Sequence, residues 1–191
     1  MKRFSESVLR RFLYLAVAVC AQACMAAQTA RVAPATGATT TIVVVRHAEK
    51  NTDDPRDPSL SAAGQERARD LSNVLKDAGI TDIYTTQYKR TRQTAEPIAQ
   101  QSGIAIVERP INAANSATYA PDLAREILTR SAGKSVLVVG HSNTVPDIVK
   151  SLSGRAVAPI TDPEYDHIFI IVIPPSGPAR LLQVRFGRPG A

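Results

Sequence analysis

The sequence has few of the cysteines on which disulfide-bonded, thiol-dependent and zinc-binding proteins depend. It has no Trp and only two Cys, Cys20 and Cys24, which both lie near the N-terminus. If that N-terminal segment is removed, the remaining chain has no thiol, which excludes disulfides, a Cys nucleophile and a Cys-ligated zinc site. A Cys-free exported domain of this size is typical of a bacterial periplasm or cell surface.

An excess of one charge is also largely absent. The formal net charge of +6 comes from 23 Lys and Arg against 17 Asp and Glu, but four of the cations and one of the acids lie within residues 1–26. The rest of the chain has 19 basic and 16 acidic residues, and no Lys/Arg run interleaved with aromatics. This balance does not favour a nucleic-acid partner.

The chain lacks a metal-binding motif. Asp53, Asp54 and Asp57 lie close together, but without the Gly turn and the closing Glu that a calcium loop requires. We therefore interpret residues 51–58, which contain two Pro, as an exposed, solvated loop. We expect neither a metal nor a cofactor.

Residues 1–26 have the pattern of a secretory signal peptide. A cationic start is followed by the apolar stretch 12–20 and then by small residues, with cleavage expected near Ala26. The apolar stretch is shorter than the ~20 residues that span a bilayer, which disfavours a retained anchor. A lipoprotein is a weaker alternative. We expect a periplasmic or secreted protein that touches a membrane only through an uncleaved leader or a lipid anchor.

The remaining chain is long enough for one domain and short for two. Residues 27–40, rich in Ala, Thr, Pro and Gly, are predicted to be a flexible linker before a domain at 41–191. Apolar runs alternate with amphipathic segments, which indicates a three-layer α/β/α sandwich with a mostly parallel central sheet. The predicted strands are 41–45, 82–86, 104–107, 135–139, 167–173 and 181–185, and the predicted helices are 61–79, 90–101, 120–131 and 145–152.

Two of the predicted strands end in a histidine. The apolar run 42–45 leads into Arg46 and His47, and the run 136–140 leads into His141. Ligands bind at the carboxyl ends of the strands in open α/β sheets, so both histidines are expected at one site. Arg90, which follows another strand, can be placed at the same edge.

Two guanidinium groups and two imidazoles at one edge favour phosphate chemistry. Arg binds two phosphate oxygens in a fork, and an imidazole can attack phosphorus and carry the phosphoryl group. Nearby arginines lower the pKa of a histidine and favour its neutral, nucleophilic form. The arginines would neutralise the charge that Mg²⁺ neutralises in many phosphoryl transfers. The expected partner is a small phosphorylated molecule.

Four segments resemble the histidine phosphatase superfamily, the phosphoglycerate-mutase-like group. They are 45–50 (Val-Arg-His-Ala-Glu-Lys, with Ala in place of the Gly of Arg-His-Gly), 60–64, 88–95 and 139–143, and together they cover most of residues 41–150.

The resemblance implies a phosphatase that works through a phosphohistidine on a nucleophilic His47. It also implies that Arg46, Arg90 and His141 form the phosphate pocket, with Asn143 beside it. Glu49 and Arg92 are further substrate-binding candidates, although the family pattern favours Arg90 over Arg92 as the pocket arginine.

A carboxylic acid to protonate the leaving group is not obvious. The candidates are Glu49, Glu108 and Asp122, none of which lies in a recognisable acid motif. Three alternatives to a phosphomonoesterase therefore stay open: a non-catalytic phosphate- or phosphosugar-binding module, a phosphomutase, and a phosphohistidine phosphatase, which the predicted export disfavours.

The sequence does not name the substrate. We expect the loops after Lys50 and over residues 112–121 to shape the choice of substrate. His167, the remaining histidine, opens a predicted strand with no motif around it, so we expect it to be structural or on the surface.

Overall fold

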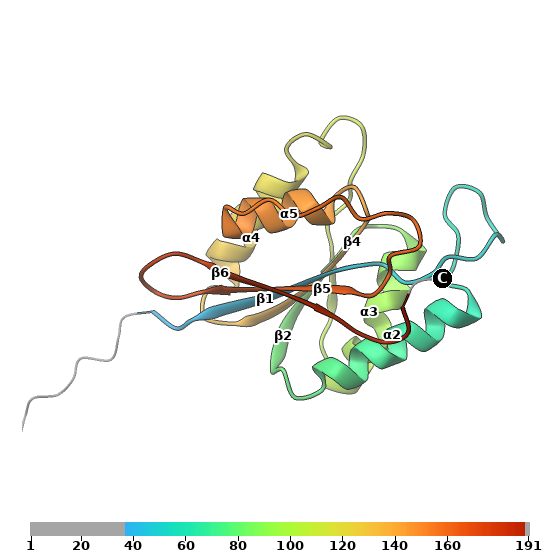
Figure 1. Ribbon diagram of the computed structural model, residues 1–191, viewed down its shortest axis with the longest axis horizontal. Helices are drawn as coiled ribbons and strands as arrows, with labels where there is room; N and C mark the ends of the chain where they lie inside the picture. Colours follow the sequence, from blue (N-terminus) through green and yellow to red (C-terminus); the bar gives the residue numbers. More distant parts are fainter. Residues whose placement is uncertain (1–36, 190–191) are drawn as a thin grey trace, which may run out of the picture. The chain divides into compact units, whose positions relative to one another are not determined.

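A computed structural model describes residues 37–189. The predicted signal peptide, both cysteines and most of the predicted linker lie outside these residues. The first strand begins at Thr40, the last residue of that linker. Element labels follow Figure 1.

A six-stranded sheet lies at the centre of the domain, in the order β3-β2-β4-β1-β5-β6. Strands β3, β2, β4 and β1 are parallel to one another, and β5 and β6 are antiparallel to their neighbours. The predicted mostly parallel sheet is confirmed. The strands are β1 (Thr40–Arg46), β2 (Ile80–Thr85), β3 (Ile106–Glu108), β4 (Ser135–Gly140), β5 (His167–Ile173) and β6 (Arg180–Arg185).

Helices cover both faces of this sheet, as the predicted three-layer architecture requires (Figure 1). Two of the helices pack against Ile42 and Val44 of β1, and the other two pack against Val43 and Val45. Successive side chains of a strand point to opposite faces, so a run of four apolar residues buries itself between two helical layers. The first pair is α4 (Tyr119–Arg130) with α5 (Val145–Ser153), and the second is α2 (Ala62–Leu75) with α3 (Lys89–Ser102).

Some element ends differ from the predictions. Helix α2 begins after Ser61, whose hydroxyl accepts from the Gly64 N–H as expected of an N-cap, but it ends at Leu75 rather than near Gly79. Helix α3 runs through Pro97 without interruption. Its packing outweighs the one hydrogen bond that Pro removes. Strand β3 is later and shorter than predicted, since it lies at the sheet edge.

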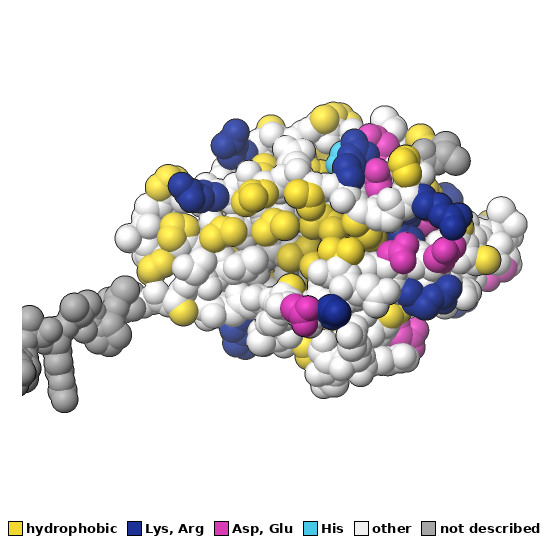
Figure 2. All heavy atoms as spheres, turned by 60° about the horizontal axis from the view of Figure 1, so that its bottom comes forward, with side chains coloured by type: hydrophobic (Ala, Val, Ile, Leu, Met, Phe, Trp, Pro, Cys, Tyr) yellow, Lys and Arg dark blue, Asp and Glu magenta, His cyan; other side chains and the backbone are white. Residues whose placement is uncertain are grey.

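One part of the sheet carries an uncovered apolar surface. Leu182 and Val184 of the edge strand β6 are 50% and 44% exposed, and their strand register places them beside Ile170 and Ile168 of β5. Hydrophobic side chains form a band along the middle of the face shown in Figure 2. Edge strands of this kind can pair with other chains.

Candidate active site

Neighbouring strand ends bring His47 and His141 together. β1 and β4 are parallel and in register up to the pair Arg46 and Gly140, and the His47 N–H donates to the Gly140 carbonyl at 2.9 Å. Each histidine is therefore the first residue beyond its strand. Their ring centroids lie 5.3 Å apart with the rings edge to face, as the two strand-end motifs predicted.

His47 is held as a neutral imidazole with one nitrogen free. Its Nδ1 lies 2.8 Å from the Ala48 carbonyl oxygen. Because a carbonyl only accepts, Nδ1 carries the proton and Nε2 carries the lone pair. The pKa of His47 is lowered to about 3, chiefly by burial and also by the charges of His141, Arg90 and Arg46, which together outweigh the raising effect of the hydrogen bond to the Ala48 carbonyl. The basic nitrogen is thus unprotonated at any physiological pH.

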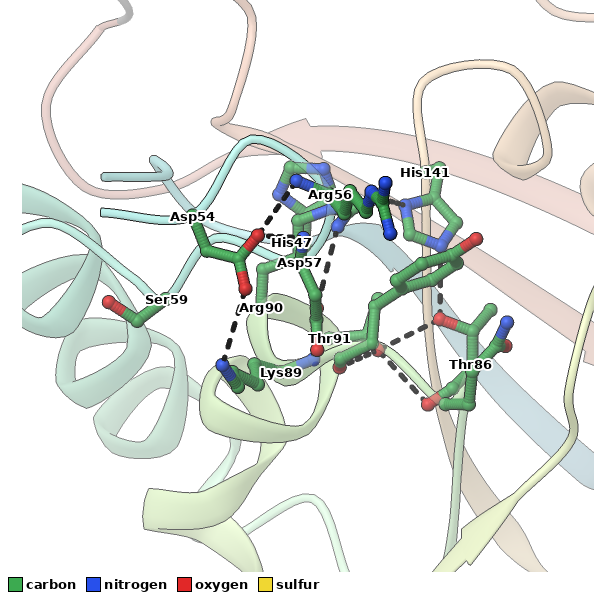
Figure 3. A network of polar contacts seen from close by, with 12 residues as sticks. His47, Asp54, Arg56, Asp57, Ser59, Thr86, Lys89, Arg90, Thr91 and His141 are labelled. Atoms are coloured by element: carbon green, nitrogen blue, oxygen red, sulfur yellow. Dashed lines mark hydrogen bonds and ion pairs between the residues drawn. The ribbon is translucent and has the colours of Figure 1, made fainter. Parts of the chain in front are cut away.

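His141 is held in the opposite tautomer by a chain of hydrogen bonds. Its Nδ1 lies 3.4 Å from Nη2 of Arg90, and a guanidinium can only donate. The proton of His141 is therefore on Nε2, which donates to the Thr86 hydroxyl at 3.0 Å. Thr86 in turn contacts the Thr91 hydroxyl at 2.9 Å, and Figure 3 shows the chain running from His141 to the start of α3.

Burial is also the main reason that the pKa of His141 falls to about 4, with Arg90 and Arg46 adding to the effect. Both imidazoles are therefore neutral before a ligand binds. A phosphate dianion brought beside His141 would favour its protonated form and so raise its pKa. Its Nδ1, which accepts from Arg90, would then become a second donor of the ring.

Arg46 is buried and its Nε is unpaired among the described residues. Its Nη1 donates to three carbonyls, those of Thr161, Asp162 and Glu164, at 2.8 to 3.2 Å, and its guanidinium stacks on the Tyr165 ring at 4.0 Å. An unpaired buried donor is costly, so the Nε–H is suited to an oxyanion.

These groups line a cavity of about 470 Å³, far larger than a phosphate group alone needs. Its walls come from the two histidine-bearing strand ends, the loop between β1 and α2, the start of α3, the segment after β3 and the loop before β5. The lining residues are Arg46, His47, Lys50, Pro55, Arg56, Pro58, Tyr88, Arg90, Ile111, Asn112, Ala113, Ser116, His141, Ser142, Asn143, Thr144 and Asp162.

The structure brings five of the predicted site residues together and leaves two outside. Arg46, His47, Arg90, His141 and Asn143 all line the cavity. By contrast, both oxygens of Glu49 accept from Nε of Arg67 at 2.9 Å, and they line a separate hollow. The other residue left outside is Arg92, whose Nε pairs with Glu108 at 2.9 Å.

The predicted acid candidates are engaged elsewhere. Glu49 is bound by Arg67, Glu108 by Arg92, and Asp122 by Arg125, and none of the three lines the cavity. The one carboxylate that does line it is Asp162, which lies 3.5 Å from Nη2 of Arg46.

Sequence reasoning missed Asp162 and the loop around it. That loop lies more than a hundred residues from Arg46 in the sequence, and no motif there signals a contact. Tyr88 stacks under the Arg90 guanidinium at 4.4 Å. The sequence placed it in the segment 88–95 but did not predict this contact. Nε2 of His167 donates to the Glu164 carboxylate at 3.2 Å, and His167 does not line the cavity, in agreement with its expected structural role.

Residues 37–189 contain neither a metal-binding cluster nor a membrane-spanning helix. No group of three His, Cys, Asp or Glu side chains is close enough together to hold a metal ion. No helix in this range is both long and apolar enough to cross a bilayer.

Comparison with known proteins shows which proteins this chain is similar to. Residues 42–111 match the model of the histidine phosphatase superfamily, branch 1. The predicted resemblance is confirmed. The probable phosphoglycerate mutase GpmB of Escherichia coli is 36% identical over 72 residues, which cover 35% of this chain. The match spans about a third (34%) of the length of that relative.

Solved structures share the fold of this chain over a larger part of its length. Mycobacterial hydrolase 1 covers 75% of this chain and 96% of its own length, with a TM-score of 0.58 and 13% identity. The protein histidine phosphatase SixA, complexed with tungstate, covers 76% and 96%, with a TM-score of 0.56 and 20% identity. Mycobacterial glucosyl-3-phosphoglycerate phosphatase covers 75% and 97%, with a TM-score of 0.57 and 12% identity.

Proposed function

We propose that this chain is an exported, metal-independent phosphatase that hydrolyses a phosphomonoester through a phosphohistidine on His47. The observation that carries the proposal is the state of that side chain. It is 5% exposed, its Nδ1 is fixed on the Ala48 carbonyl, and its neutral Nε2 lies in a cavity with Arg46, whose Nε is unpaired among the described residues. A buried, oriented and unprotonated imidazole is a competent nucleophile.

In the first step, Nε2 of His47 attacks phosphorus while the bond from phosphorus to the leaving oxygen breaks with its electron pair. Arg46 and Arg90 neutralise the phosphoryl oxygens, and His141 donates to them once the anion raises its pKa. In the second step, a water oxygen attacks phosphorus, the N–P bond breaks, and inorganic phosphate leaves with the neutral imidazole restored.

The cavity lining offers little acid catalysis, so the substrate needs a leaving group that departs without it. Asp162 is the one carboxylate in the lining, and its side chain is 98% exposed and paired with Arg46. We therefore propose substrates whose leaving oxygen departs readily or is protonated by water.

The test is turnover of p-nitrophenyl phosphate, with and without EDTA, by the purified chain and by His47→Ala. We expect turnover across about pH 4 to 8 that EDTA does not change and that His47→Ala abolishes. Acid-sensitive phosphorylation of the wild-type protein during turnover, absent from the variant, would identify the intermediate. Full activity in His47→Ala would overturn the assignment of the nucleophile.

The export part of the proposal rests on the cationic and apolar pattern of residues 1–26. It is tested by fusing these residues to a reporter that is active only outside the cytoplasm. Reporter activity that is lost when the apolar stretch 12–20 is interrupted by charged residues supports export, and activity that survives the change refutes it.

The second candidate function is a phosphate-binding module without turnover. The engagement of Glu49, Glu108 and Asp122 in ion pairs outside the cavity favours it. The two functions separate in one experiment, because a binding module would be stabilised against thermal unfolding by phosphate and would show no turnover of any phosphomonoester in a broad panel.

A further inference from the structure

The cavity carries more positive charge than one phosphate group requires. Four cations line it, Arg46, Lys50, Arg56 and Arg90, against the single carboxylate of Asp162. Arg46 and Arg90 lie with the histidines and are sufficient to neutralise a phosphoryl dianion. Lys50 and Arg56 belong to a different wall, the loop between β1 and α2.

Lys50 and Arg56 differ from most other cations of the domain. Among residues 37–189 neither has a carboxylate within ion-pair distance, whereas Arg67, Lys89, Arg90 and Arg92 all do. The acids nearest in sequence accept hydrogen bonds from backbone N–H groups instead. Asp54 accepts from the backbone of Arg56 and Asp57, and Asp57 accepts from the Lys89 N–H at the start of α3.

The loop that carries these two cations is structured. Lys50 forms an antiparallel bridge with Leu60, the Asn51 N–H donates to the Ser59 carbonyl, and Asp53 binds the backbone and hydroxyl of Ser59. Figure 3 shows Asp54 and Asp57 joined to Lys89 and Arg90. A loop that is closed at its base and tied to α3 has little backbone entropy left to lose when its cations bind a ligand.

We propose that Lys50 and Arg56 form a second anion subsite, so that the substrate carries a further negatively charged group besides the phosphate that is removed. This rests on the proposed function and names its substrate class: a phosphomonoester that also bears a carboxylate or a second phosphate. The cavity of about 470 Å³ has room for such a molecule, and Asn112, Ser116 and Ser142 add neutral polar groups to its lining.

The test compares substrates that differ only in the second group. One pair is 4-carboxyphenyl phosphate and 4-carbamoylphenyl phosphate, and the other is glucose 1,6-bisphosphate and glucose 6-phosphate. Two partly exposed ion pairs predict a preference of about tenfold in kcat/KM for the doubly anionic member, weakening as salt rises. The first pair reports a carboxylate and the second a phosphate.

The double variant Lys50→Met/Arg56→Met should reduce this ratio to near one. Arg69→Met is the matched control, because Arg69 also lacks an ion-pair partner among the described residues and lies on a different surface. Comparing the ratio in each variant with the ratio in the wild type cancels the difference between leaving groups, because that difference is the same in both proteins. Turnover of p-nitrophenyl phosphate with no preference for either charged substrate would overturn this inference and leave the phosphatase intact. Absence of all turnover would instead overturn the proposed function.

Discussion

At the scale of single residues, the two histidines are made different by what each ring is bonded to. His47 gives its proton to the Ala48 carbonyl and keeps a free Nε2, whereas His141 gives its proton to Thr86 and turns Nδ1 toward Arg90. Identical side chains 5.3 Å apart are thereby suited to the two different roles that we propose, nucleophile and latent donor. The backbone carbonyl and the Thr86 hydroxyl assign these roles.

Thr86→Val should therefore impair catalysis through His141. The change keeps the shape of a side chain that is 0% exposed but removes the acceptor of the His141 N–H. Leaving one buried donor unpaired costs about 1 to 3 kcal/mol, so we expect kcat to fall roughly tenfold. Steady-state kinetics with p-nitrophenyl phosphate measures this.

The matched control is Thr81→Val, an exposed threonine whose hydroxyl donates to the Ser135 carbonyl far from the cavity. Its kcat should equal that of the wild type. An unchanged kcat in Thr86→Val would show that the tautomer of His141 does not matter to the reaction.

At the scale of elements, α2 approaches the strand end that carries the nucleophile. A Cβ at Gly64 would come within 2.1 Å of the Glu49 carbonyl oxygen, and this same carbonyl accepts from the Ser61 N–H. Arg67, one turn further along α2, binds the Glu49 carboxylate. The first two turns of the helix thus fix the backbone two residues beyond His47.

Gly64→Ala should destabilise the domain. The added methyl group cannot be accommodated without moving α2 away from Glu49, and overpacking of this kind costs roughly 1 to 3 kcal/mol. Urea unfolding measures the loss. Gln65→Ala, an exposed neighbour in the same helix, should leave the midpoint nearly unchanged. Equal midpoints for both variants would contradict the close-approach argument.

Element patterns predicted much of the site and misplaced part of it. Apolar runs that end in Arg46-His47 and in His141 predicted two strand ends, and parallel pairing brought them together. Glu49 and Arg92 were also near the site in sequence, yet their side chains point to other partners. Sequence distance from a strand end does not fix the direction of a side chain once the chain leaves the strand.

At the scale of the whole molecule, acid should destabilise the fold through its two active-site histidines. Their pKa values are lowered to about 3 and about 4, whereas an unfolded histidine titrates near 6.5. As the pH falls below about 6.5, the unfolded chain binds protons that the native site refuses, so stability is present above that pH and lost below it. At about pH 5 the loss is on the order of 2 kcal/mol per histidine.

Urea unfolding at about pH 7.5 and pH 5 tests this, with the double variant His47→Gln/His141→Gln as the reference. Carboxylates titrate in both proteins, so the difference between them isolates the histidines. We expect the wild type to lose several kcal/mol more than the variant. Equal losses would show that the histidines are not held neutral.

Long-range contacts are the part of the molecule that sequence patterns could not predict. The alternation of strands and helices was sufficient for the layers and for the sheet, because each element buries its own apolar face. The carbonyls that hold Arg46, by contrast, belong to Thr161, Asp162 and Glu164, more than a hundred residues away. Backbone acceptors have no residue-type signal, so nothing in the sequence marks them.

The dependence of Arg46 on that distant loop has a consequence for biosynthesis. A nascent chain that ends before Thr161 can contain the nucleophile, Arg90 and His141, yet its Arg46 has none of the acceptors that Nη1 uses in the finished fold. Phosphate would then stabilise only the completed chain, since a ligand favours the state that binds it.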